Sequence, residues 1–394
     1  MTDFLIDYAT FLVRWLHVIA AIAWIGASFY FVWLDNHLEP TDTPDDGLAG
    51  QLWAIHGGGF YNSRKFRGAP PEAPKHLHWF KWEAYWTWIS GFSLLVLVYY
   101  THPAEYLTAA NGPLSSAAAI AVSIGFLLAA WLVYDALCRS PLGKRGLSLT
   151  IVGVAVIVLW HWAMLHLFGN RGAYIQIGAM LGTCMAANVL MVIIPGQKRM
   201  VSALLAGAPP DLAAGIRGKQ RSVHNNYLTL PVVALMLSSH APATYGNSRS
   251  WLILAAIVVG GMLVRHFVNP RHRGTLNWWL PAAVGAIIVA VGVYLAPDDT
   301  PAAPRGQAAS FADVQPIIRQ RCAVCHATAP TQPGISTAPA GVLLDEPARI
   351  VSLAWRINEQ AVVLKAMPPG NITGITEGER ATIGAWFASG APGP

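Results

Sequence analysis

The sequence has 394 residues, of which 54% are hydrophobic and only 12% are charged. This share of apolar residues exceeds that of an ordinary soluble enzyme, so the composition predicts a membrane protein and argues against a soluble globular class. The formal net charge of +6 is not gathered into a basic patch of the kind that binds DNA or RNA, so we expect no nucleic-acid partner.

Eight apolar segments are long enough, or nearly so, to cross a hydrocarbon core of roughly 30 Å. They lie near residues 10–34, 82–100, 115–137, 148–168, 173–194, 225–240, 250–268 and 277–296. We therefore predict an all-α fold, in which residues 1–297 form an eight-span transmembrane helix bundle. A small soluble domain follows it.

Lys and Arg alternate between the connecting loops, with sixteen on one side of the bundle and two on the other. By the positive-inside rule, the N-terminus and everything after residue 296 lie outside the cytoplasm. We therefore expect a multi-pass protein of a bacterial inner membrane, in contact with the lipid bilayer, with its N-terminus and its C-terminal domain in the periplasm.

The C-terminal part divides into a Pro-rich linker, residues 298–309, and a domain over residues 310–394. We expect its first helix from Phe311 to Arg321 and its last from Thr376 to Ala388. Terminal helices whose aromatic side chains meet at their crossing are typical of small class I-like cytochromes c.

The motif Cys322-Ala-Val-Cys325-His326 is the attachment signal for a c-type haem. Two thioethers from Cys322 and Cys325 would hold the porphyrin, and His326 would bind the iron. A zinc site would need a second pair of ligands, but no Cys or His follows His326. Met367, which is the only methionine after the motif, is the predicted sixth ligand.

Histidines in the outer half of the predicted spans suggest a second haem. Facing imidazoles are the usual ligands of a b-type haem, and Arg14, one turn before His17, could neutralise a propionate. The predicted pair is His17 with His161 or His166. Taken singly, each of these residues is more often a structural or helix-end residue than a ligand.

The inner side of the predicted bundle carries unusual polar stretches. The run from His56 through three glycines to Arg67 combines cations and aromatics, and the sixth span opens with His224, Asn225, Asn226 and Tyr227. A short, amide-rich, proline-interrupted span indicates a polar cavity. An interfacial aromatic belt is the simpler reading of the tryptophans near residue 82.

Five stretches of this chain resemble the PuuD family, the bacterial membrane-bound urate oxidases that carry a C-terminal cytochrome c. These are residues 15–30, 56–61, 78–88 and 224–227, and the haem motif. The resemblance implies oxidation of urate to 5-hydroxyisourate, with electrons passing through haem to the respiratory chain and not to dioxygen. Soluble or membrane cytochrome c, or a terminal oxidase, would be the acceptor.

Urate at neutral pH is a flat monoanion with amide donors and acceptors, so its site needs a cation, amides, stacking aromatics and a base. The candidate bases are Glu83, His224 and His56. The predicted substrate-binding residues are Arg64, Lys65, Arg67, Trp82, Trp86, Asn225, Asn226 and Tyr227.

Two other functions fit parts of the pattern. A quinol:cytochrome c electron-transfer protein would share the haems and the topology, but it would need an apolar channel open to lipid. A transporter with an appended redox sensor would explain a polar cavity but would leave the haem without a task.

Overall fold

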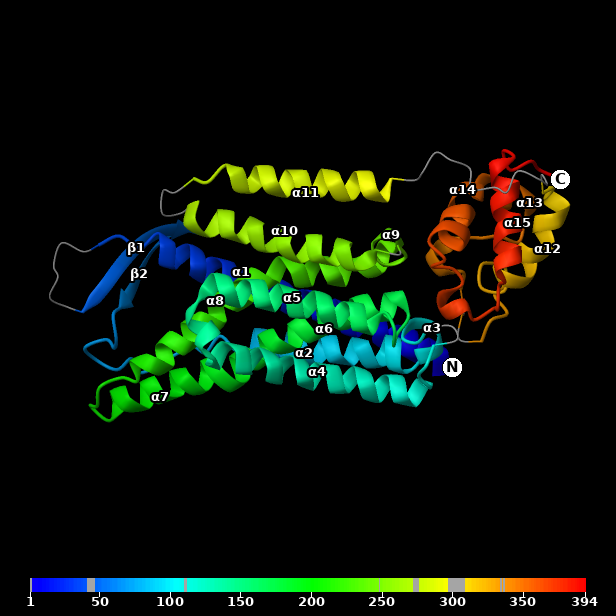
Figure 1. Ribbon diagram of the computed structural model, residues 1–394. Helices are drawn as coiled ribbons and strands as arrows, with labels where there is room; N and C mark the ends of the chain where they lie inside the picture. The colour runs from blue at the N-terminus through cyan, green and yellow to red at the C-terminus, as the bar shows by residue number, and fades with distance from the viewer. Residues whose placement is uncertain are drawn as a thin grey trace.

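The computed structural model describes residues 2–40, 47–109, 112–247, 249–271, 276–296, 309–333, 335 and 337–394. Helices occupy most of the described chain, and the bundle helices run side by side (Figure 1). The main bundle helices are α1 (Thr2–Asn36), α2 (Trp82–Leu94), α4 (Ser116–Arg139), α5 (Gly146–Met164), α6 (Asn170–Ala187), α7 (Ile194–Leu205), α8 (Leu212–Leu237), α10 (Ser250–Arg271) and α11 (Trp279–Leu295).

Helices lie in each of the eight segments predicted to span a membrane. Five stretches of helix are long and apolar enough to do so, namely Leu5–Asn36, Ser116–Arg139, Gly146–Met164, Asn170–Leu205 and Ser250–Asn269. The stretch in α2, the polar α8 and the 17-residue α11 do not meet this standard. The structure therefore supports several membrane-spanning helices, while the count of eight stays a prediction.

Helix α6 forms the centre of the bundle. It packs against α2, α4, α5 and α8, and most of its side chains are buried. Its Gln176 is fully buried, where it donates to the backbone carbonyl of Ser123 (2.8 Å) and accepts from the Ser123 hydroxyl (2.7 Å). Buried polar groups need such partners in an apolar interior, so this pair fixes α4 against α6.

The expectation of a purely α-helical fold was incomplete, because residues 48–66 form a β-hairpin. Strands β1 (Leu48–His56) and β2 (Gly59–Phe66) pair antiparallel, and His56 lies opposite Gly59. The connecting residues Gly57 and Gly58 have φ values of +57° and +81°. A two-residue hairpin turn of this kind needs positive φ, which glycine adopts without steric cost.

The sixth predicted span also differs from the expectation. We expected it over residues 225–240, but helix α8 begins at Leu212 and continues through Pro231 to Leu237. Its first half is polar, so hydropathy alone does not reveal it.

The C-terminal unit, residues 309–394, has a hydrophobic core of its own. Its helices are α12 (Phe311–Arg321), α13 (Pro347–Ser352), α14 (Ala354–Ile357) and α15 (Glu377–Ala388). The first and last helices lie where they were expected, and the rings of Phe311 and Trp386 meet 6.2 Å apart in this core. The predicted linker lies outside the described residues, apart from Ala309.

Capping boxes explain the starts of both terminal helices of this unit. In each box, the side chain of the first residue accepts from the backbone N–H of the second, and the side chain of the second accepts from the backbone N–H of the first. The pairs are Ser310 with Asp313 at the start of α12 and Thr376 with Glu379 at the start of α15. These pairs supply partners for backbone N–H groups that have none inside the helix.

Candidate functional site

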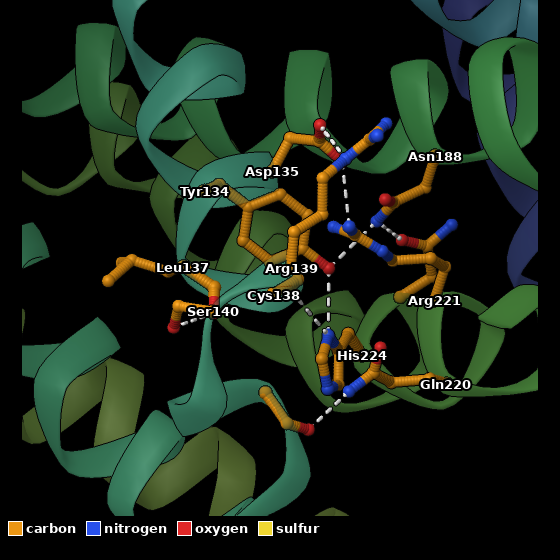
Figure 2. Close-up of polar contacts among 12 residues, drawn as sticks. Tyr134, Asp135, Leu137, Cys138, Arg139, Ser140, Asn188, Gln220, Arg221 and His224 are labelled. Carbon is orange, nitrogen blue, oxygen red and sulfur yellow. Dashed lines mark hydrogen bonds and ion pairs between the residues drawn. The ribbon is translucent and has the colours of Figure 1, made fainter.

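A cluster of polar side chains lies where α4 ends and α8 passes it (Figure 2). We call it the Tyr134–His224 cluster, and its members are Tyr134, Asp135, Cys138, Asn188, Arg221, His224 and Asn225. These elements lie toward the end of the bundle that carries the hairpin and α7, opposite the C-terminal unit (Figure 1).

Helix α8 supplies three members of the cluster on one face. Arg221, His224 and Asn225 are spaced i, i+3 and i+4, which places their side chains next to one another on a helix. Arg221 is only 3% exposed and Asn225 only 5%. A cation is therefore held among helices of the apolar bundle.

The Tyr134 hydroxyl joins two parts of the cluster. It lies 2.8 Å from Nδ1 of His224 and accepts a hydrogen bond from Nδ2 of Asn188 at 3.0 Å. Asn188 Nδ2 also donates to Oδ1 of Asn225 (2.8 Å), and Asn225 donates to the carbonyl of Met185 (3.0 Å). These bonds fix the orientation of the His224 ring.

The charge of Arg221 is only partly balanced. Its Nη2 donates to Asp135 Oδ1 at 2.7 Å, and its guanidinium lies 4.9 Å from the ring centroid of Tyr134. Asp135 also pairs with Arg139 at 2.6 Å, so one carboxylate serves two arginines. With Arg139, which is exposed and lies outside the cluster, the three charged groups carry a net charge of +1, which favours an anionic ligand.

Two buried atoms of the cluster have no hydrogen-bond partner in the described chain. They are Nη1 of Arg221, which is a donor, and Oδ1 of Asn188, which is an acceptor. An unsatisfied buried polar group costs roughly 1–3 kcal/mol, so such groups call for an explanation. Nη1 lacks an acceptor, and Oδ1 lacks a donor.

A second buried cation lies on the opposite side of α8. Arg265 on α10 donates from Nε and Nη2 to Oδ1 of Asn226 (3.1 and 2.8 Å) and lies 3.9 Å from the ring centroid of Phe29. Asn226 in turn donates to the Ser28 hydroxyl at 3.3 Å. The predicted pair of amides is thus divided between two clusters.

The predicted cations of the hairpin are not part of either cluster. Arg64 donates to Asn62 on its own strand (3.1 Å), and Lys65 pairs with Asp35 of α1 at 2.6 Å. Arg67 is exposed, and His56 lies at the hairpin turn. These four residues lie on the hairpin beside the bundle end, and none is in contact with His224.

The aromatic residues of α2 and Glu83 form a separate surface. Trp82 and Trp86 are 58% and 47% exposed, and Lys81 lies over the Trp82 ring. Glu83 has no ion-pair partner within the described chain, but it stands in the first turn of α2. The helix dipole favours an acid at this position. Tyr227 bonds to His266 through its hydroxyl (2.8 Å).

Two of the predicted c-haem residues, His326 and Met367, are held by hydrogen bonds to the surrounding chain. Nδ1 of His326 donates to the Val342 carbonyl (3.2 Å), which leaves Nε2 as the metal-binding atom. Two hydrogen bonds of 3.0 Å fix the Met367 backbone. Its N–H donates to the Gln360 carbonyl, and its carbonyl accepts from Nη1 of Arg380. Burial lowers the pKa of His326, which favours the neutral ring that ligation requires.

The two cysteines of the motif form no disulfide with each other or with the other cysteines. Across the described ranges, no three His, Cys, Asp or Glu side chains converge on one point as a direct metal site. A haem needs no such cluster, because the porphyrin supplies four of the iron ligands.

The outer histidines lie in different surroundings. His17 Nδ1 lies 3.0 Å from both the Thr87 carbonyl and the Ser90 hydroxyl, and its Nε2 lies 3.4 Å from Met236 Sδ. His161 is fully buried, and neither of its ring nitrogens has a hydrogen-bond partner among the described residues.

The structure does not bring the predicted haem-b residues into contact with one another. His166 is exposed and bonds to the Trp162 carbonyl (2.9 Å), and Arg14 is also exposed. Among these residues, His161 has both ring nitrogens without a hydrogen-bond partner. His17 bonds to a backbone carbonyl through Nδ1, and metal-binding histidines commonly make such a bond with the nitrogen that does not bind the metal.

Taken together, these features define a largely helical protein with several helices able to span a membrane and charged side chains buried among them. The family model described as urate oxidase N-terminal matches residues 3–296. The chain belongs to this family. No curated protein and no solved structure matches the chain.

Several residues of the clusters were not predicted as site residues. Arg221 was assigned to a loop, and Tyr134, Asp135, Asn188 and Arg265 received no role. Two of these residues carry a signal in the sequence. Asp135 stands near the end of a long apolar segment, and Arg221 precedes His224 by three residues. Ionisable residues within spans are costly and indicate function.

Proposed function

We propose that this chain oxidises urate to 5-hydroxyisourate within a bacterial inner membrane and passes the electrons outward through haem. The observation that carries the proposal is membership of the urate oxidase N-terminal family over residues 3–296. The reaction consumes urate and one water and yields 5-hydroxyisourate, two electrons and two protons. It therefore needs an anion site, a base and an electron acceptor.

The Tyr134–His224 cluster supplies the first two. Arg221 Nη1 would donate to the urate anion, and Asn188 Oδ1 would accept from a urate N–H group, which pairs both unsatisfied atoms. His224 would act as the base, because Tyr134 holds its Nδ1 and its Nε2 makes no hydrogen bond in the described chain. General base catalysis requires a base that is held in a fixed position.

Haem, when bound, would accept the electrons one at a time. Cys322 and Cys325 would attach the c-type haem, with His326 and Met367 as ligands, and His161 or His17 would serve a b-type haem in the bundle. Soluble or membrane cytochrome c, or a terminal oxidase, would then take the electrons from the periplasmic side.

The charge distribution supports an outward-facing C-terminal unit. The loops 101–109 and 241–247, at the end of the bundle near this unit, hold no Lys or Arg, whereas the hairpin at the other end holds Arg64, Lys65 and Arg67. By the positive-inside rule, the hairpin would then lie in the cytoplasm and the C-terminal unit in the periplasm.

Anaerobic urate oxidation tests the proposal. Purified protein with an artificial electron acceptor should convert urate without dioxygen and without forming hydrogen peroxide. Arg221→Gln should abolish this turnover, whereas Arg64→Gln, on the exposed hairpin, should retain it. Turnover that requires dioxygen, or that survives in Arg221→Gln, contradicts the proposal.

A second candidate function is quinol:cytochrome c electron transfer. A largely apolar cleft of about 310 Å³ lies between the segment before α2 and α7, lined by Leu77, His78, Trp79, Phe80, Met200 and Leu204, among others. An apolar cleft of this size would suit a quinol ring. Reduction of the haem by quinol but not by urate would favour this function.

A further inference from the structure

The C-terminal unit is docked on the bundle through a close backbone contact. Helix α3 (Pro103–Tyr106) packs against residues 369–371 of the C-terminal unit. Gly370 lies so close to Ala104 that an added Cβ would meet the Ala104 carbonyl oxygen. Gly246, directly after α9 (Pro242–Tyr245), makes a similar approach to Leu364, whose carbonyl oxygen would lie 2.9 Å from its Cβ.

The docked face of the C-terminal unit is the face that carries the haem-binding residues. Gly370 follows Met367 by three residues, and Ala366 packs against the hydrophobic core of the bundle. The Met367 side of the expected haem iron therefore lies within a few residues of the bundle surface.

Aromatic side chains lead from this contact into the bundle. The rings of Tyr106 and Tyr99 lie 6.1 Å apart, and the guanidinium of Arg171 lies over both, at 4.6 and 5.9 Å from their centroids. From α9, the ring of Tyr245 lies 6.4 Å from that of Tyr174, which lies 4.9 Å from the ring of the unsatisfied His161.

Arg171 gives this region a positive charge. It has no carboxylate partner in the described chain, and its Nε is buried without a hydrogen bond. The rings of Tyr99 and Tyr106 face its charge. A cation beside an electron acceptor stabilises the reduced form of that acceptor, because reduction adds a negative charge.

We propose that the C-terminal unit receives electrons through the face it docks on α3 and α9, with Tyr106, Tyr99, Tyr245 and Tyr174 filling the path from His161. The proposal rests on the proposed function, since it assumes haem at Cys322 and Cys325. With haem held by Cys322, Cys325 and His326, each transfer would move one electron from a reduced centre in the bundle, supplied by urate oxidation, to the C-terminal unit. No bond forms or breaks and no proton moves.

Two glycines of the same loop provide a matched test. Gly370 and Gly374 have φ values of +56° and +66°, so Ala imposes similar backbone strain at both. Only Gly370→Ala forces a side chain into α3, because the nearest atom to an added Cβ at Gly374 is Arg321 Nη1, at 3.8 Å. Gly246→Ala disturbs the contact from the bundle side and leaves the C-terminal unit unchanged.

Two measurements are needed. Hydrogen exchange at residues 104–107 reports docking without any turnover, and rapid mixing with urate under anaerobic conditions reports the rate of c-haem reduction. Gly370→Ala and Gly246→Ala should speed the exchange and slow the reduction by about tenfold or more, with direct chemical reduction unchanged. Gly374→Ala should match the wild type in both.

Faster exchange with an unchanged rate of reduction would overturn the docked route, and so would unchanged exchange in both disturbing variants. Wild-type protein whose haem is not reduced by urate would instead refute the proposed function. The same comparison with a quinol donor would then decide the docked route by itself.

Discussion

Replacing Tyr134 by Phe is the most informative single change in the Tyr134–His224 cluster. It removes one oxygen and leaves the ring, so the helix packing is retained. The lost hydroxyl bonds to His224 (2.8 Å) and accepts from Asn188 (3.0 Å), which is fully buried. Leaving such partners unsatisfied should lower the free energy of unfolding by about 1–3 kcal/mol.

The same change should affect catalysis, because the His224 ring loses the contact that orients it. A misplaced reacting group commonly costs about 10²-fold, so kcat/KM for urate should fall roughly 10- to 100-fold. The assay is anaerobic urate oxidation with an artificial acceptor, beside denaturant unfolding in detergent.

Tyr100→Phe is the control for this experiment. Its hydroxyl bonds to Ser123 at 2.7 Å, away from the cluster, so the variant should lose similar stability and keep its turnover. Tyr134→Phe with wild-type kcat/KM would refute the catalytic role of the cluster and leave it as a structural network.

Three further predictions concern the C-terminal unit. Cys325→Ala should remove covalently bound haem, seen as loss of haem staining after denaturing electrophoresis, while urate turnover with an artificial acceptor continues; retained staining would contradict the attachment. Met367→His should keep the haem but lower its potential in a redox titration, because imidazole replaces the thioether; an unchanged potential would remove Met367 as a ligand. The backbone N–H of Thr376 and the guanidinium of Arg321 hold the pKa of Glu379 below its ordinary value of 4.5. Its contribution to stability is therefore present above pH 4.5 and is lost as the pH falls through the folded-state pKa. Glu379→Gln should destabilise the unit by about 0.5–2 kcal/mol at pH 7 and by less in acid, as measured by thermal unfolding across pH; an equal loss at every pH would contradict this role.

Local signals predicted the helices of the C-terminal unit well. The expected start and end of α12 and the end of α15 agree with the structure. The capping boxes at the two helix starts are local signals, because each joins residues three positions apart. The hairpin escaped prediction because its three glycines suggested a flexible run, although a pair of glycines between alternating residues is also a turn signal.

The candidate site was harder to predict because its contacts are long-range. Tyr134 and His224 are 90 positions apart, and no local pattern pairs them. Asn225 and Asn226 were expected in one pocket, but neighbouring residues on a helix point about 100° apart, so each joins a different cluster. The first half of α8 was missed because its charges suggested a loop.

The central claim is that urate delivers electrons to haem in this protein. The most direct measurement is a pyridine-haemochrome spectrum of the purified protein, followed by anaerobic addition of urate. We predict both b-type and c-type haem in the spectrum, and reduction of both by urate. Protein whose haem is reduced by quinol but not by urate would contradict the claim.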